Sequence, residues 1–171
     1  MAANVSQDVF QPAMAFTTWA DQQIVQVARQ LTTAQFEAAQ PSGVKTIHAT
    51  LAHMLGAQQT WIRRWNGSSP ARLADATDYP TLESIATAWT DTHRDLEAFV
   101  AAGIDPQRLI TYKTTKGIEY TYPLGMLVWH VVNHSTQHRS EAAAMCSAVG
   151  HSPGDLDILV YLRQIFPKTD A

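Results

Sequence analysis

Two histidines with chelating spacing, His134 and His138, stand four residues apart in a stretch with helical periodicity. On a helix such a pair has Cβ atoms about 5 to 6 Å apart, so both imidazoles can reach one ion at about 2.0 to 2.1 Å. On spacing alone, chelation and a chance pair are equally good interpretations. The stretch is not the HExxH motif of metalloproteases, because Ser135 occupies the Glu position and supplies no general base.

A metal site of this kind needs a third protein ligand, and His53 is the best candidate for it. His53 lies off the main apolar stripe of its own predicted helix. Its helical neighbours share small side chains and are Thr46, Ala49, Thr50, Ala57 and Thr60. They leave room for an ion and a ligand. Taken alone, a histidine at such a position is more often a satisfied or half-exposed side chain than a ligand.

Three further polar residues stand near the histidine pair. Glu141 follows His138 by three residues, where its carboxylate either accepts the free N–H of a ligand imidazole or is an ordinary solvated charge. His130 precedes the pair by one turn, and it either supports the site or takes part in capping of the helix by hairpin residues, which is at least as good an interpretation. Arg139 can reach an anionic substrate, but a surface role is the simpler prediction.

The remaining histidines, His48, His93 and His151, are predicted to be peripheral, because they stand near a helix start, in a polar run and in a loop. Cys146 falls on the apolar stripe of its helix and has no basic neighbour to lower its thiol pKa. We therefore predict a small core residue there and not a nucleophile.

The elements that must position these residues are helical. Apolar periodicity predicts long helices over residues 8–30, 44–65, 82–102 and 123–149 and a short one over 156–165. Ser42, Thr81 and Asp155 are the predicted N-caps of three of them, and a Thr32–Gln35 capping box predicts a further short segment. Residues 109–113 and 118–122 favour strands joined by a turn, which indicates a small hairpin. The fold class is therefore all-α, a four-helix bundle with a β-hairpin before the fourth long helix, in one domain over residues 1–171.

Composition excludes several classes of protein. With 12 Lys+Arg, 15 Asp+Glu and a net charge of -3, the chain has no basic run suited to phosphates, so no nucleic-acid partner is expected. No stretch approaches the roughly 18 apolar residues of a membrane span. The single Cys146 cannot form an internal disulfide and the N-terminus lacks the features of a secretory signal, so we expect a cytoplasmic protein.

Two segments carry a family resemblance. The segment GMLVWHVVNHSTQHRSEAAAMCSAVGHSPGDLDILVYL resembles the C-terminal signature of the DinB/YfiT-like superfamily, in which an N-H-x-x-x-H-R run precedes a Gly-x-x-Pro loop and an Asp that opens the last helix. The segment TIHATLAHMLGAQQTWIRRWNG is similar to the second helix of that family. The resemblance implies an up-down-down-up bundle, a homodimer, and one divalent ion on His53, His134 and His138. Zinc or nickel is expected first, with iron or manganese as alternatives.

The resemblance also implies an activity. Members of the superfamily resemble thiol-dependent enzymes, including transferases that use low-molecular-weight thiols such as bacillithiol or mycothiol, and related isomerases. Three neutral ligands leave the full charge of an ion available to lower the pKa of a bound thiol or water. We therefore expect a metal-dependent thiol S-transferase or related enzyme that acts on a small molecule. The alternative is a non-catalytic, stress-associated metal-binding protein. Hydrolysis at the same ion needs a general base that the sequence does not identify. Ser140, where the family often has Gly, bears on substrate preference alone.

Overall fold

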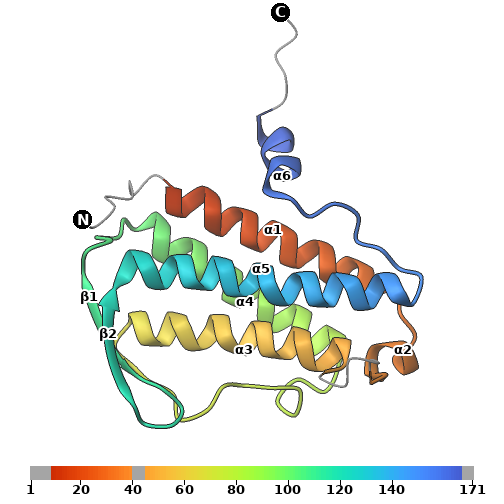
Figure 1. Ribbon diagram of the computed structural model, residues 1–171, viewed down its shortest axis with the longest axis horizontal. Helices are drawn as coiled ribbons and strands as arrows, with labels where there is room; N and C mark the ends of the chain where they lie inside the picture. The colour runs from red at the N-terminus through yellow and green to blue at the C-terminus, as the bar shows by residue number, and fades with distance from the viewer. Residues whose placement is uncertain (1–8, 40–44, 167–171) are drawn as a thin grey trace, which may run out of the picture.

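The computed structural model describes residues 9–39 and 45–166, in which four long helices form a bundle (Figure 1). They are α1 (Phe10–Ala28), α3 (Ile47–Trp65), α4 (Leu82–Ala101) and α5 (Leu124–Ala148). α1 and α5 run in one direction and α3 and α4 in the other, because the loop over residues 66–81 crosses back along the bundle before α4 begins. The up-down-down-up four-helix bundle is thus confirmed. Among the described residues, no helix is both long and apolar enough to cross a membrane.

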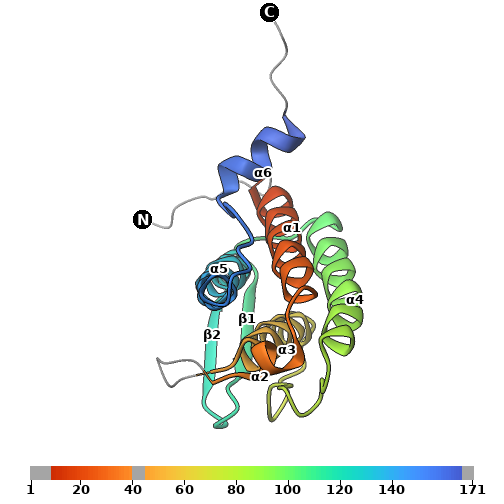
Figure 2. The same cartoon turned by 90° about the vertical axis from the view of Figure 1, so that its right-hand side faces the viewer.

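Each long helix packs against two others, as the end-on view in Figure 2 shows. α5 contacts α1 and α3, and α4 contacts the same two helices from the opposite side. The ends of α1, α4 and α5 lie within two residues of the predicted ends. Such differences are ordinary at frayed helix termini.

Side-chain caps set the starts of three helices, α2, α3 and α4. The capping box of Thr32 and Gln35 precedes α2 (Thr33–Glu37), and Thr81 caps α4 as predicted. The predicted start of α3 at residue 44 is wrong, because Thr46 accepts a hydrogen bond from the backbone N–H of Ala49 and the helix begins at Ile47. Ser42, the cap predicted there, lies outside the described residues.

The last helix also starts later than predicted. α6 (Ile158–Ile165) begins after Asp157, whose carboxylate accepts from the backbone N–H of Leu159 at 2.7 Å. Asp155, the predicted cap, instead accepts from the N–H of Asp157 and shapes the turn before the helix. In Figure 1, α6 stands away from the other helices. It touches α1 through the ring of Tyr161, which lies against Phe16 and Trp19.

The predicted hairpin is present and bridges two helices. β1 (Leu109–Lys113) pairs antiparallel with β2 (Glu119–Pro123), so the second strand is one residue later than predicted. Gly117, with φ +77, provides the left-handed position of the turn. β1 packs against α3 and β2 packs against α5. The hairpin therefore lies at one end of the junction between these two helices.

The bundle core has two apolar clusters with a buried polar layer among the four helices. One cluster contains Ile24, Leu51, Leu55, Ile85 and Trp89, and the other contains Met14, Trp61, Leu96, Leu124 and Val128. The layer takes one polar side chain from each long helix: Asp21, Gln58, His93 and Arg139. All four are at most 4% exposed, so their hydrogen bonds must be made inside the protein.

The loop over residues 66–81 makes a close approach to α3 at Gly56. A Cβ atom at residue 56 would lie 2.1 Å from the backbone oxygen of Ala74 and 2.9 Å from its carbonyl carbon. No side chain fits at that separation, so glycine is needed there for space and not for its backbone angles. The loop is thereby held against α3 one turn beyond His53.

Candidate metal centre

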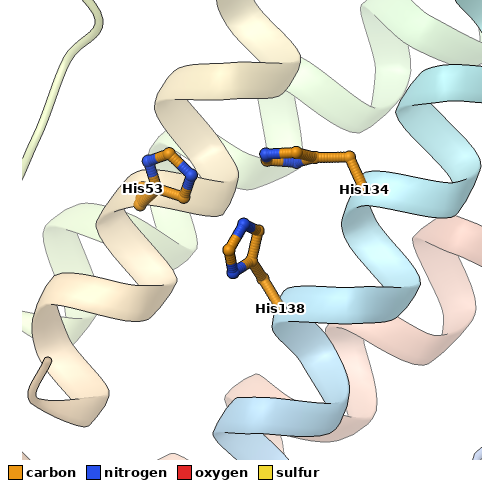
Figure 3. A group of neighbouring side chains, drawn as sticks. All are labelled: His53, His134 and His138. Carbon is orange, nitrogen blue, oxygen red and sulfur yellow. The ribbon is translucent and has the colours of Figure 1, made fainter. Parts of the chain in front are cut away.

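The structure brings the three predicted ligands together between α3 and α5. His53 comes from α3 and faces His134 and His138 on α5 (Figure 3). The ring centroids lie 5.2 Å apart for His53 and His134, 4.7 Å for His53 and His138, and 4.5 Å for the α5 pair. One nitrogen from each ring lies within 4.8 Å of the other two. One ion with bonds of about 2.0 to 2.1 Å can span this group after small side-chain rotations.

The environment favours neutral imidazoles. His53 and His134 are partly exposed, whereas the side chain of His138 is only 12% exposed. Burial lowers the pKa of His53 to about 4, and the positive charge of Lys45 adds to the effect. Burial likewise lowers the pKa of His134 to about 4, with the charge of His138 next in size. At neutral pH these two rings therefore carry free lone pairs, the form that binds a metal.

Glu141 contacts His138, the third predicted ligand. Its Oε2 lies 2.7 Å from Nδ1 of His138, so the ring donates from Nδ1 and turns Nε2 toward the other two histidines. A carboxylate on the outer nitrogen of a ligand histidine fixes the tautomer and makes the ring a stronger ligand. Of the two interpretations left open for Glu141, the structure favours the supporting role.

His130 begins a row of rings that leads from the triad toward the hairpin. Its ring centroid lies 5.6 Å from that of His134 and 5.0 Å from that of Trp61, against which it packs edge-on. Burial, and then the positive charge of Arg64, lowers the pKa of His130. His130 is outside the triad that could share one ion.

Two members of the buried polar layer, Gln58 and Arg139, lie on the same two helices as the triad. Arg139 donates from Nη1 to Oδ1 of Asp21 at 2.9 Å, and Gln58 donates to Oδ2 of Asp21 at 2.7 Å. The same amide nitrogen of Gln58 lies 3.1 Å from the hydroxyl of Ser135. α3 and α5 are thus joined by a hydrogen bond at Ser135, the residue that follows His134.

Two sequence predictions about this layer were wrong. Arg139 was expected at the surface, but its side chain is 2% exposed because Asp21 of α1 receives its charge in the core. His93 was expected to be peripheral, yet it is 4% exposed, with Nε2 3.4 Å from Oδ2 of Asp21 and its ring stacked on Trp89. Periodicity places a residue on a helix face, but it does not identify a polar partner on another helix.

His48 is also buried, contrary to its predicted peripheral place. Its Nδ1 lies 2.7 Å from a carboxylate oxygen of Glu37, and its Nε2 lies 2.6 Å from the backbone oxygen of Tyr79. It therefore ties α2 and the 66–81 loop to α3. Cys146 is fully buried as predicted, and burial raises the pKa of its thiol to about 11.

Comparison with known proteins finds similarity both to a protein family and to a solved structure. The model of the DinB family matches residues 6–169. Among solved structures, the chain is similar to YfiT from Bacillus subtilis, described as a probable metal-dependent hydrolase with an unusual four-helix bundle topology. That match has a TM-score of 0.69 at 13% identity and covers 89% of this chain and 94% of YfiT. No curated protein sequence matches the chain.

Proposed function

The chain belongs to the DinB family, and from this premise we propose that it is a divalent-metal-dependent enzyme whose ion is held by His53, His134 and His138. The observation that carries the proposal is the convergence of three imidazoles from α3 and α5, one of them backed by Glu141. Zinc and nickel fit a site made of imidazole nitrogens best, and iron or manganese are alternatives.

The surroundings of the triad support activation of a nucleophile. A divalent ion on three neutral ligands lowers the pKa of a thiol or water that it binds. Burial keeps the rings of His53 and His134 neutral at neutral pH, and Glu141 keeps Nε2 of His138 turned inward. The triad is partly exposed, so a small molecule can reach it.

We propose S-transfer from a low-molecular-weight thiol as the reaction. The sulfur would attack an electrophilic carbon of the second substrate, the leaving group would depart with its electron pair, and the thiol proton would pass to solvent. A thiol needs less help than water to ionise, since its ordinary pKa is far lower. This matters because Glu141 is engaged by His138 and the buried Asp21 by Arg139, which leaves neither free as a general base.

Hydrolysis at the same ion is the second candidate. The description of YfiT as a probable metal-dependent hydrolase supports it, because the two chains share a fold. The two reactions differ in their need for a base. Hydrolysis would require a proton acceptor for water beside the triad, whereas S-transfer would proceed without one.

Metal analysis of protein purified without added metal tests the site. We expect about one equivalent of a divalent ion in the wild type and little in His53→Ala or His138→Ala. His130→Ala is the matched control, since it removes a neighbouring ring outside the triad and is expected to keep the ion. Full occupancy in both ligand variants would refute the assignment.

Thiol consumption against a panel of electrophiles then tests the reaction. Turnover that is lost on metal removal and restored by metal addition would support the transferase. Hydrolysis of activated esters or amides without a thiol would favour the second candidate. A protein that binds the ion and shows neither activity would be a non-catalytic, stress-associated metal-binding protein instead.

We also propose that the protein is a homodimer. Apolar side chains are exposed on the outer face of α5, at Met126 and Trp129, and on the protruding α6, at Ile158 and Leu159. Large apolar side chains exposed on these two helices support a surface that a partner covers. Sedimentation analysis should give twice the monomer mass, and a monomer at all concentrations would reject the dimer.

A cytoplasmic location is proposed as well. The single Cys146 supports it, because a chain without any pairing partner for its thiol gains nothing from an oxidising compartment. Fractionation with compartment markers tests the proposal, and recovery outside the cytoplasmic fraction would contradict it.

A further inference from the structure

Arg64, near the end of α3, is a buried cation without a carboxylate partner in the described part of the chain. Its residue is 7% exposed. The guanidinium carbon lies 4.7 Å from the ring centroid of Trp61 and 4.8 Å from that of Tyr112. Nη2 donates to the backbone oxygen of Lys113 at 3.2 Å, while Nε is buried without any hydrogen-bond partner.

The position of Arg64 connects it to the triad. It lies where the hairpin meets α3, and a row of rings leads from it through Trp61 and His130 to His134. In Figure 2 the hairpin lies alongside α3 and beneath α5, the two helices that carry the triad. Arg64 bonds the backbone of this hairpin at Lys113.

A buried guanidinium with an unused donor is costly. Removal of a charge from water costs several kcal/mol unless a counter-charge or a full set of hydrogen bonds replaces it. The two aromatic faces replace only part of that lost hydration. A guanidinium presents a planar fork of N–H donors that matches carboxylate and phosphate groups. An anion of this kind would accept the hydrogen bond that Nε of Arg64 now lacks.

The charges around the triad point in the same direction. Glu141 is the carboxylate beside the triad, and it is occupied by His138. With a divalent ion in place, the region would carry more positive than negative charge, which favours a negatively charged substrate.

We infer that Arg64 binds an anionic oxygen group, a carboxylate or a phosphate, of the substrate that reacts at the triad. The inference rests on the proposed function, because it takes the triad as the reacting centre. The substrate class is then a bifunctional small molecule, with one end at the triad and an anionic group beyond His130. Arg64 acts in binding and takes no part in the chemical step.

A series of synthetic ligands of increasing length tests the inference by binding alone, without any turnover. The metal-loaded full chain is titrated by calorimetry with hydroxamates, which bind zinc and nickel directly, joined by methylene chains of increasing length to a carboxylate. Each is compared with its uncharged methyl ester, and a phosphonate series distinguishes phosphate from carboxylate recognition. Charge-assisted hydrogen bonds are worth about 1.5 to 3 kcal/mol, so the anionic ligand should bind roughly ten to a hundred times more tightly at one chain length.

Variants assign the preference to Arg64. Arg64→Gln should abolish it while leaving the affinity for the methyl ester unchanged, which also shows that the metal site and hairpin remain intact. Arg63→Gln is the matched control, because Arg63 is the exposed neighbour on the same helix, and it should keep the full preference. Arg64→Lys should restore part of it. An anion-to-ester ratio near one at every length in the wild type, or an unchanged ratio in Arg64→Gln, would overturn the inference.

Failure of this inference and failure of the proposed reaction give different results. If hydroxamates show an Arg64-dependent preference but no thiol is consumed, the anion site stands and the transferase falls. If thiols are consumed and no ligand shows the preference, the transferase stands and the role of Arg64 is rejected.

Discussion

Nη1 of Arg139 donates to Oδ1 of Asp21 at 2.9 Å inside the bundle, and Arg139 directly follows His138 in the chain. The proposed ligand His138 is therefore adjacent to Arg139, which a buried ion pair fixes to α1. Gln58 extends the connection to α3, the helix that carries His53. Buried hydrogen bonds thus fix α3 and α5, the two helices that carry the triad, relative to each other.

Loss of the Arg139 side chain should strongly destabilise the fold. Arg139→Ala would leave the carboxylate of Asp21 buried without its cation, a change that costs about 3 to 5 kcal/mol. Urea unfolding measures the loss. Arg94→Ala is the control, because Arg94 pairs with Asp91 in solvent and such pairs contribute about 0 to 1 kcal/mol. Equal losses of unfolding free energy in the two variants would mean that the buried pair stabilises the fold no more than the exposed one.

Glu141→Gln should weaken metal binding without removing a ligand. The amide can still accept from Nδ1 of His138, but it lacks the charge that strengthens the ring as a ligand, and such changes cost about 10- to 100-fold in affinity. Competition with a chelator of known affinity provides the measurement. Glu119→Gln, on the exposed hairpin, is expected to match the wild type. An unaltered affinity in Glu141→Gln would reduce Glu141 to a surface charge.

The metal-free protein should lose stability as the pH falls from about 6.5 to 4. In the folded state the pKa values of His53 and His134 are about 4, below the usual 6.5. Below pH 6.5 the unfolded chain therefore takes up protons that the folded chain does not, and the free energy of unfolding falls. Above pH 6.5 neither state binds these protons, so the two groups contribute no pH dependence there.

Urea unfolding at several pH values checks this expectation. The control is the double variant His53→Gln, His134→Gln, which removes both titrating rings and should show a shallower decline over the same range. Parallel curves for the two proteins would show that other groups are responsible.

The thiol of Cys146 should be inert in the folded protein. It is fully buried, and burial raises its pKa to about 11, so almost no thiolate is present at neutral pH. Iodoacetamide is expected to label it only after denaturation. Cys146→Ala should retain metal binding and any activity. Rapid labelling of the native protein would contradict the buried assignment.

Gly56→Ala should destabilise the protein, although alanine is the better helix former. At an exposed helical site the exchange gains about 1 kcal/mol, whereas here the methyl group would meet the backbone of Ala74. Overpacking of this kind typically costs about 1 to 3 kcal/mol. A rise in the melting temperature of the variant would show that the loop yields without cost.

Local patterns in the sequence were sufficient for the helices, the hairpin and the ligand pair. His134 and His138 could be placed because one helix fixes their separation, and Thr81 could be recognised as a cap because a cap acts within one turn. Arg139 and His93 could not be placed, because their burial depends on Asp21, which lies far away in the chain. A helix face tolerates a buried charge only where another helix supplies its partner, and that pairing leaves no local signal.

The late starts of α3 and α6 have a similar cause. Thr46 and Asp157 hold extended conformations, and their side chains accept hydrogen bonds from the backbone N–H groups three and two residues ahead. The two helices therefore begin directly after them.

The close contact of Gly56 with Ala74 also restricts how this protein can evolve. While the loop keeps its course, residue 56 is closed to every side chain, so a substitution there can spread only after the loop has already moved. The loop and the middle of α3 are thus expected to change together among descendants of this sequence. His53 lies one turn from Gly56. A substitution in the loop, although far from the triad along the chain, is therefore expected to go together with changes beside His53.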